Sequence, residues 1–224
     1  MKREFLRTGD GSITIHLPEW NEQYHSRHGA IAEAVHVFIK SGLHQKWASE
    51  ANEISILEIG FGTGLNCYLS LLEAERRQSL IKYTGIEAYP VEGSEISQLN
   101  YPQLLDDSGE LFEKIHRPPW EVQTEITANF QLLKQQLLFE KIDFINAFDL
   151  IYFDAFGPRV QPNLWTEKIF QSMFNALKPN GILVTYSAKG SVRRAMQEVG
   201  FSVERLAGPP GKREMLRAVK GEQR

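Results

Sequence analysis

Short apolar runs alternate with segments of helical periodicity along most of the chain. Buried strands are predicted at residues 54–59, 83–87, 130–138, 148–153 and 182–186. Helices are predicted at residues 65–77, 165–177 and 191–199. Strands that alternate with helices are typical of an α/β, doubly wound domain with a mostly parallel sheet. Two extended runs, 201–206 and 214–219, flank a turn rich in glycine and proline and predict a C-terminal antiparallel hairpin.

The N-terminal part of the chain has a different pattern. A Gly-Asp-Gly turn at residues 9–11 joins two extended segments and predicts a hairpin within residues 5–17. From Gly29 onward, apolar residues recur at helical spacing, which predicts a helix. Gly42 stands where that helix would stop.

The length of the chain sets the number of domains. A chain of 224 residues is long enough for one sizeable core and short for two. We expect residues 1–50 to form a small N-terminal cap on a single core domain of residues 51–224. Within this domain, residues 101–128 contain three prolines and are expected to form an insertion.

Composition excludes several classes of protein. No apolar run approaches the roughly 18 residues of a membrane span, and the N-terminus has no signal core, so a cytoplasmic protein without a membrane partner is expected. The single cysteine, Cys67, excludes an intrachain disulfide. The six histidines show no zinc-helix motif, so we expect no metal. A net charge of −3 does not indicate general nucleic-acid binding, although a local basic patch stays open.

A glycine-rich loop stands between the first core strand and the first core helix. Its alternating glycines allow a sharp turn and the close approach of a nucleoside-type cofactor. The fingerprint of dinucleotide-binding loops requires its third glycine at the position where this chain has Leu65. The loop instead resembles motif I of the class I S-adenosylmethionine (SAM)-dependent methyltransferases; the alternative is a turn without a ligand. The candidate cofactor-binding residues here are Glu58, Gly60, Phe61, Gly62, Thr63, Gly64 and Asn66.

Glu87 ends the second core strand. An acid at this distance beyond the glycines can accept hydrogen bonds from both ribose hydroxyls of a cofactor. A nicotinamide cofactor would use the same acid, so only the spacing of the glycines distinguishes SAM from a nicotinamide cofactor. The alternative is a solvated loop carboxylate.

Asp154 and Phe156 follow the fourth core strand. Ligands of open α/β sheets bind outside the carboxyl ends of the strands, so both side chains should face the crevice of the glycine loop. A carboxylate and an aromatic face suit a planar substrate that bears an amine, which makes both residues catalytic candidates. The alternative for Asp154 is a cap on the next helix.

Several landmarks, in the same order, are similar to those of the MnmD family and of the methyltransferase half of bifunctional MnmC enzymes. They are residues 8–12, 24–30, 58–66, 154–158, 163–165, 185–194 and 208–216. The resemblance implies the class I SAM methyltransferase (Rossmann-like) fold. It also implies methyl transfer from SAM to the exocyclic amine of 5-aminomethyl-2-thiouridine at the tRNA wobble position, giving 5-methylaminomethyl-2-thiouridine.

The same resemblance has further implications. Tyr24 and His25 would close over the cofactor; packing of the N-terminal arm is the alternative. Family members usually show an acid at the end of the third strand to hold adenine, whereas the alignment places Leu137 and Leu138 there. The fused flavin domain of MnmC is not expected in a chain of this length.

Contact with a tRNA anticodon stem-loop would need positive charge beside the crevice. Phosphate contacts come mainly from lysine and arginine. The candidate RNA-binding residues are Lys189, Arg193, Arg194, Lys212 and Arg213. The alternative is a solvated helix face.

Two other functions stay open at this level. One is SAM-dependent methyl or aminopropyl transfer to a free small-molecule amine. The other is a catalytically silent SAM-binding module. Only the tRNA methyltransferase would label RNA from labelled SAM.

Overall fold

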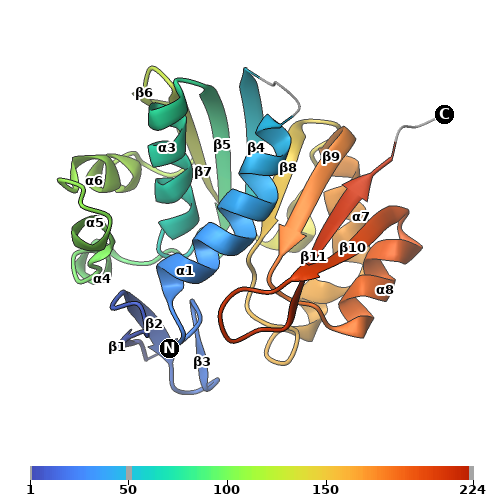
Figure 1. The fold of residues 1–224 in the computed structure, drawn as a ribbon, viewed down its shortest axis with the longest axis horizontal. Coiled ribbons are helices and arrows are strands. Elements are labelled where there is room, and N and C mark those ends of the chain that lie inside the picture. The colour runs from blue at the N-terminus through green and yellow to red at the C-terminus, as the bar shows by residue number, and fades with distance from the viewer. Residues whose placement is uncertain (1, 49–51, 222–224) are drawn as a thin grey trace.

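The computed structural model describes residues 2–48 and 52–221. Within these residues the chain forms one large and one small sheet (Figure 1). The large sheet consists of β4 (Glu53–Ile59), β5 (Leu80–Glu87), β6 (Thr124–Thr127), β7 (Phe130–Gln136), β8 (Phe148–Phe153), β9 (Leu177–Thr185), β10 (Phe201–Ala207) and β11 (Glu214–Lys220). The small sheet consists of β1 (Glu4–Arg7), β2 (Ile13–Leu17) and β3 (Glu22–Gln23).

Parallel strands form the centre of the large sheet. The strand order is β10-β11-β9-β8-β4-β5-β7-β6. The pairs from β9 to β7 are parallel, and β11, β10 and β6 add antiparallel edges. In β4, Ile54, Ile56, Leu57 and Ile59 are fully buried, as expected of a strand that helices cover on both faces. The predicted doubly wound sheet and C-terminal hairpin are confirmed.

Helices cover both faces of this sheet. On one face lie α3 (Leu65–Arg77) and a continuous helix made of α1 (Ala30–Ala34), the π-helical η1 (Val35–Leu43) and α2 (His44–Trp47); on the other lie α7 (Glu167–Ala176) and α8 (Gly190–Glu198) (Figure 1). Each layer has its own core. The first contains Phe38, Trp47 and Tyr68, and the second contains Trp165 and Met173.

The N-terminal helix does not stop at Gly42, contrary to the prediction. It continues to Trp47, and Gly42 lies against the sheet instead. A Cβ atom on Gly42 would stand 3.0 Å from Val184 Cγ2 and 3.3 Å from Tyr152 Cε1. The glycine is needed for the close approach of helix and sheet, so this helix is part of the core. The predicted domain boundary between residues 50 and 51 lies outside the described residues.

The insertion at residues 101–128 is more regular than predicted. It contains α5 (Tyr101–Leu104) and α6 (Glu110–His116), and it ends in β6, which pairs antiparallel with β7 and extends the sheet. The third core strand ends at Gln136, two residues earlier than predicted. The remaining short helices are α4 (Gly93–Ile96), η2 (Phe139–Lys141) and η3 (Pro162–Trp165).

The order of the strands reverses at β4. The chain runs from β4 through β5 to β7 on one side and then crosses to β8 and β9 on the other. In open α/β sheets, such a switch point leaves a crevice at the carboxyl ends of the strands. Among the described residues, no helix is long and apolar enough to cross a membrane.

Candidate active site

A cleft of about 1270 Å³ opens at the carboxyl ends of the central strands. Gly60, Glu87, Asp154 and Tyr186, at or just beyond the ends of β4, β5, β8 and β9, line it together with the N-terminal segment. The small N-terminal sheet lies at this end of the large sheet (Figure 1). The topology therefore brings side chains from distant parts of the sequence into one cavity.

The glycine loop is held against the neighbouring strands. The backbone N–H groups of Gly60 and Phe61 both donate to the carbonyl oxygen of Ile86, at 3.0 Å. Gly60 has φ +90°, and a Cβ atom there would lie 2.8 Å from the carbonyl oxygen of Asp154. A side chain at Gly60 would thus force the loop away from β8. The close packing of the loop against Asp154 is thus by itself a sufficient reason for glycine at position 60, without a ligand.

Asn66 connects the loop to the neighbouring strand end. Its side chain is only 2% exposed, in the first turn of α3. The Nδ2 atom donates to Glu58 Oε1 and to Asp154 Oδ2, both at 2.9 Å. The hydroxyl of Tyr83 donates to the other oxygen of Glu58, at 2.8 Å. Removing one partner from such a buried network costs about 1–3 kcal/mol.

Glu58 contacts residues of the site but lies behind the lining of the cleft. It is buried and does not line the cleft, so the structure gives no support to the predicted direct contact with a cofactor. Burial raises the pKa of Glu58 well above its usual range. Its role in this geometry is to position Asn66. Gly64 does not line the cleft either, because it faces His116.

Asp154 lines the cleft, as the sequence predicts. Burial and the nearby carboxylate of Glu33 raise the pKa of Asp154 well above that of an exposed aspartate. The alternative of a helix cap is wrong, because η3 follows Gln161 and α7 follows Thr166. Asp154 thus lines the cleft and does not cap a helix.

Three aromatic rings form one side of the cleft, which we call the aromatic wall. Phe156 meets Tyr24 edge to face at 5.0 Å and Trp20 at 5.7 Å between ring centroids. Tyr24 also lies against the glycine loop, with its Cδ1 atom 3.0 Å from where a Cβ of Gly62 would be. Trp20 was missed by the sequence analysis, because a lone tryptophan outside any motif carries no local pattern.

His25 lines the cleft and is buried. Its Nδ1 atom lies 3.1 Å from the hydroxyl of Thr14. Burial lowers the pKa of His25 to about 4, so the ring is neutral near neutral pH. Residues 24 and 25 pack within the N-terminal arm and also line the cleft, and their closure over the cofactor stays a prediction.

Glu87 is tied to the glycine loop. One of its oxygens accepts a hydrogen bond from the Gly62 N–H, at 3.1 Å, and the other accepts one from the Tyr89 N–H, at 2.9 Å. It lines the cleft from the end of β5. Leu138 also lines the cleft, and so does Glu140, two residues further on. An acid is thus present near the end of the third core strand, a few residues beyond the aligned position.

Carboxylates dominate the charge of the cleft. In the described part of its lining, the only lysine or arginine side chains are Arg3 and Lys212. The carboxylates are Glu22, Glu33, Glu87, Glu92, Glu95, Glu140 and Asp154. A cleft with this excess of negative charge attracts cations. Among the described residues, no group of three or more histidine, cysteine, aspartate and glutamate side chains could hold a metal ion.

The predicted RNA-binding residues separate into three places. Lys212 lies in the cleft wall, where its Nζ atom contacts Glu33 Oε1. Lys189 and Arg213 line a smaller groove of about 490 Å³ that shares Lys212 with the cleft. Arg193 and Arg194 lie on α8 and line neither cavity.

A family model described as S-adenosyl-L-methionine-dependent methyltransferase matches residues 109–221, just over half of the chain. The chain belongs to this family. The cofactor of the methyltransferase is therefore SAM.

Bifunctional relatives resemble the methyltransferase over most of its length. The tRNA 5-methylaminomethyl-2-thiouridine biosynthesis bifunctional protein MnmC of Cupriavidus necator is 30% identical over 88% of this chain and 32% of its own. MnmC of Cupriavidus metallidurans is 28% identical over 95% of this chain and 33% of its own. The methyltransferase thus spans about a third of the length of these relatives.

Solved structures share the fold. The crystal structure of MNMC2 from Aquifex aeolicus superposes with a TM-score of 0.79 and 25% identity, covering 98% of this chain and 70% of that one. A spermidine synthase structure covers the same shares with a TM-score of 0.59 and 19% identity, which shows a common fold alone.

The residues of the cleft fit SAM. In the described part of the chain, Asn66 Oδ1 is buried without a hydrogen-bond partner, so it can accept a hydrogen bond from the ammonium group of SAM. Glu87 would accept hydrogen bonds from the ribose hydroxyls. The carboxylate-rich lining suits the positive charge of a sulfonium.

Replacement of Glu87 by glutamine should weaken SAM binding without unfolding the protein. The amide keeps the shape but loses the charged acceptor, worth about 1.5–3 kcal/mol for a hydrogen bond. We expect about 10- to 100-fold weaker binding of S-adenosylhomocysteine by calorimetric titration. Glu53→Gln, at the N-terminal end of β4 and thus at the end of the sheet away from the cleft, is the control. Equal affinities of parent and Glu87→Gln would contradict the assignment.

Replacement of Asp154 by asparagine should change the pH dependence of stability. The folded-state pKa of Asp154 is raised, so the parent loses stability as pH rises from about 4, where the carboxyl group of the unfolded chain ionises, until the pH reaches the raised pKa of the folded protein. Asparagine does not titrate. The melting temperature of Asp154→Asn relative to the parent should therefore rise as the pH increases above about 4. A difference that does not change with pH would contradict the raised pKa.

Proposed function

We propose that this methyltransferase transfers a methyl group from SAM to the exocyclic amine of 5-aminomethyl-2-thiouridine at the wobble position of tRNA. The product is 5-methylaminomethyl-2-thiouridine. The MnmC relatives, named for the biosynthesis of this nucleoside in tRNA, support the proposal. The observation that carries it is the position of Asp154 beside the aromatic wall, because a carboxylate and aromatic faces together suit a planar base with an amine.

The target amine reacts only in its neutral form. A primary alkyl amine is mostly protonated near neutral pH, and an ammonium has no lone pair with which to attack carbon. The raised pKa of Asp154 makes its carboxylate a stronger base than an exposed aspartate. Asp154 can therefore accept the proton that the amine must lose. When bound, SAM supplies an electrophilic methyl group on its sulfonium.

Orientation is the second contribution of these residues. The Asn66 amide holds one oxygen of Asp154 and so restricts the rotation of its carboxylate. The aromatic wall offers apolar faces to a base on the side of Phe156. Holding nitrogen, methyl carbon and sulfur in line can itself account for a large part of a rate enhancement.

The smaller groove suits the phosphates that flank the modified nucleoside. Arg159, Lys189 and Arg213 line it, and it adjoins the cleft at Tyr186 and Lys212. Arg159 was missed by the sequence analysis; it pairs with Glu22 at 3.2 Å. Lysine and arginine side chains in such a groove supply the salt-dependent part of RNA binding. The proposed partner is the anticodon stem-loop of tRNA.

Methyl transfer to tRNA tests the proposal directly. The parent enzyme should transfer labelled methyl from SAM to tRNA that carries 5-aminomethyl-2-thiouridine, and nucleoside analysis should place the label at the wobble position. Asp154→Asn should lower the single-turnover rate by about 100-fold or more, because a positioned acid–base group contributes on that scale. Its affinity for SAM should stay close to that of the parent.

Transfer RNA without the aminomethyl group is the control substrate. Label on a free small-molecule amine but not on tRNA would favour the alternative of a small-molecule methyltransferase or aminopropyl transferase. Cofactor binding without any transfer would favour a silent SAM-binding module. A near-parental rate of Asp154→Asn would exclude its role as acceptor of the proton.

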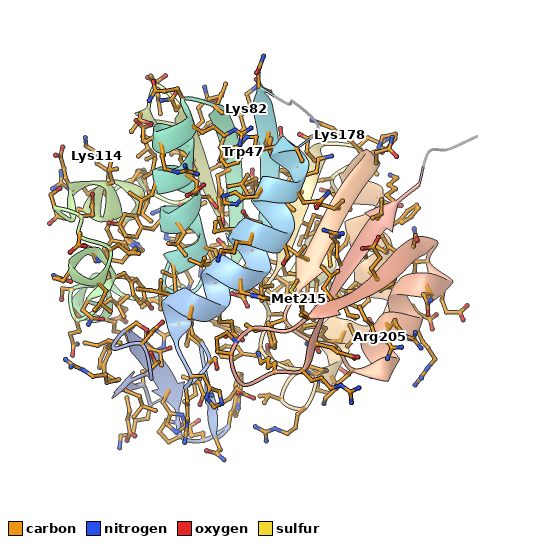
Figure 2. The ribbon with its side chains drawn as sticks, in the orientation of Figure 1. Trp47, Lys82, Lys114, Lys178, Arg205 and Met215 are labelled. Atoms are coloured by element: carbon orange, nitrogen blue, oxygen red, sulfur yellow. The ribbon has the colours of Figure 1, made fainter. Side chains whose placement is uncertain are left out.

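The salt dependence of tRNA binding tests the groove. The double variant Lys189→Ala/Arg213→Ala should flatten the slope of log K against log salt concentration by about two, one for each lost phosphate contact. Lys82→Ala/Lys178→Ala is the matched control, since both lysines lie at the opposite end of the sheet (Figure 2). An unchanged slope in the groove variant would place the RNA elsewhere.

A further inference from the structure

A lysine from the last hairpin reaches into the catalytic cleft. Lys212 Nζ lies 2.5 Å from Glu33 Oε1, and it stands over the ring of Tyr186, 3.9 Å from the centroid. Glu33 comes from α1 and is only 7% exposed. The pair therefore joins two segments 179 residues apart inside the cavity that Asp154 also lines.

The hairpin holds this lysine in place. The Lys212 N–H donates to the Pro209 carbonyl at 2.9 Å, and the Gly208 N–H donates to the Arg213 carbonyl at 3.0 Å. A Cβ on Gly208 would lie 2.5 Å from the Lys212 carbonyl oxygen, so the turn is closed tightly on itself. The turn reaches from the strand edge toward α1 across the end of the sheet (Figure 1).

Glu33 is fixed from its other side as well. Its Oε2 atom accepts a hydrogen bond from the Ser26 N–H, at 2.8 Å. A buried carboxylate held by a backbone donor and a lysine keeps its position. The titratable groups that interact electrostatically with Glu33 are His25, Asp154 and Tyr186, and Lys212 acts on Asp154 as well. Asp10 acts on His25, and Glu22 acts on Tyr186 and lines the same cleft.

The two charges act on Asp154 in opposite directions. The carboxylate of Glu33 raises the pKa of Asp154, and the ammonium of Lys212 lowers it. An amine bound at Asp154 would experience the same two charges. The charges of Glu33 and Lys212 therefore partly cancel at Asp154 and at an amine bound beside it.

We propose that the Lys212–Glu33 ion pair is a positioning element of the catalytic centre that sets the electrostatic potential where the methyl group is transferred. Lys212 disfavours the ammonium form of the acceptor and leaves Asp154 free to receive its proton. Its charge is directed into the cleft and not toward the RNA backbone. For the identity of the acceptor, this inference rests on the proposed function.

Cofactor analogues test the potential without any acceptor. S-adenosylhomocysteine is neutral at sulfur, whereas sinefungin carries an ammonium in place of the sulfonium methyl group. The ratio of their affinities cancels general losses of cofactor binding. Lys212→Met should raise the preference for sinefungin by about tenfold, because the potential becomes more negative, and Glu33→Gln should lower it.

The double variant and a distant pair provide the controls. Lys212→Met/Glu33→Gln removes both charges and should return the ratio to within about twofold of the parent. Lys82 and Glu53 form an ion pair of 2.6 Å at the end of the sheet away from the cleft. Their matched variants, Lys82→Met and Glu53→Gln, should leave the ratio unchanged. Melting curves of all variants establish that each is folded.

The pH profile of single-turnover methylation is the second readout. Loss of Lys212 raises the pKa of the bound amine, so the acid limb should move to higher pH in Lys212→Met. The limb should move to lower pH in Glu33→Gln and return in the double variant. If the parent does not methylate tRNA, the proposed function fails, and the analogue ratio still decides this inference.

Unchanged affinity ratios in Lys212→Met and Glu33→Gln would exclude an electrostatic role at the transfer site. A flatter salt dependence of tRNA binding in Lys212→Met, together with those unchanged ratios, would assign Lys212 to the RNA surface instead.

Discussion

The site depends on one buried amide. Asn66 bridges Glu58, at the end of β4, and Asp154, just beyond β8, and it does so from the first turn of α3. These strands are the neighbours at the switch point of the sheet. The amide therefore connects the first turn of α3 to both strand ends and restrains the carboxylate of Asp154. Its free Oδ1 atom, in the described part of the chain, leaves an acceptor for the cofactor.

Negative charge is concentrated around this amide, and the fold stabilises it in different ways. Glu58 is satisfied by hydrogen bonds from Asn66 and Tyr83, and Glu33 by Lys212. Asp154 retains a raised pKa because burial and Glu33 together oppose its ionisation. A pKa that is shifted by burial and by a neighbouring charge is characteristic of functional sites. In this cleft it suits a reaction that brings a cationic cofactor to an amine that must lose a proton.

Much of the fold and part of the site could be predicted from the sequence. The core strands, α3, the C-terminal hairpin and the positions of Asp154 and Glu87 follow from local patterns. Gly42 was misread because a glycine that permits close packing and one that ends a helix look alike in sequence. Glu33 was missed because it lies away from the apolar stripe of the predicted helix, where a carboxylate looks like a solvated one. Glu140 was missed because it lies in a short helix after the strand and not at the strand end, where the alignment placed the acid.

The sequence by itself determined the alternation of strands and helices, the glycine turn and the chemistry of the residues that follow each strand. These depend on interactions over a few residues, whose periodicity is visible in one dimension. Only the tertiary structure decided which charges meet. Asn66 and Asp154 are 88 residues apart, and Glu33 and Lys212 are 179 residues apart. Lys212 and Arg213 are chain neighbours with the same charge, yet only Lys212 reaches the cleft, because the direction of a side chain in a turn is set by the packing around it.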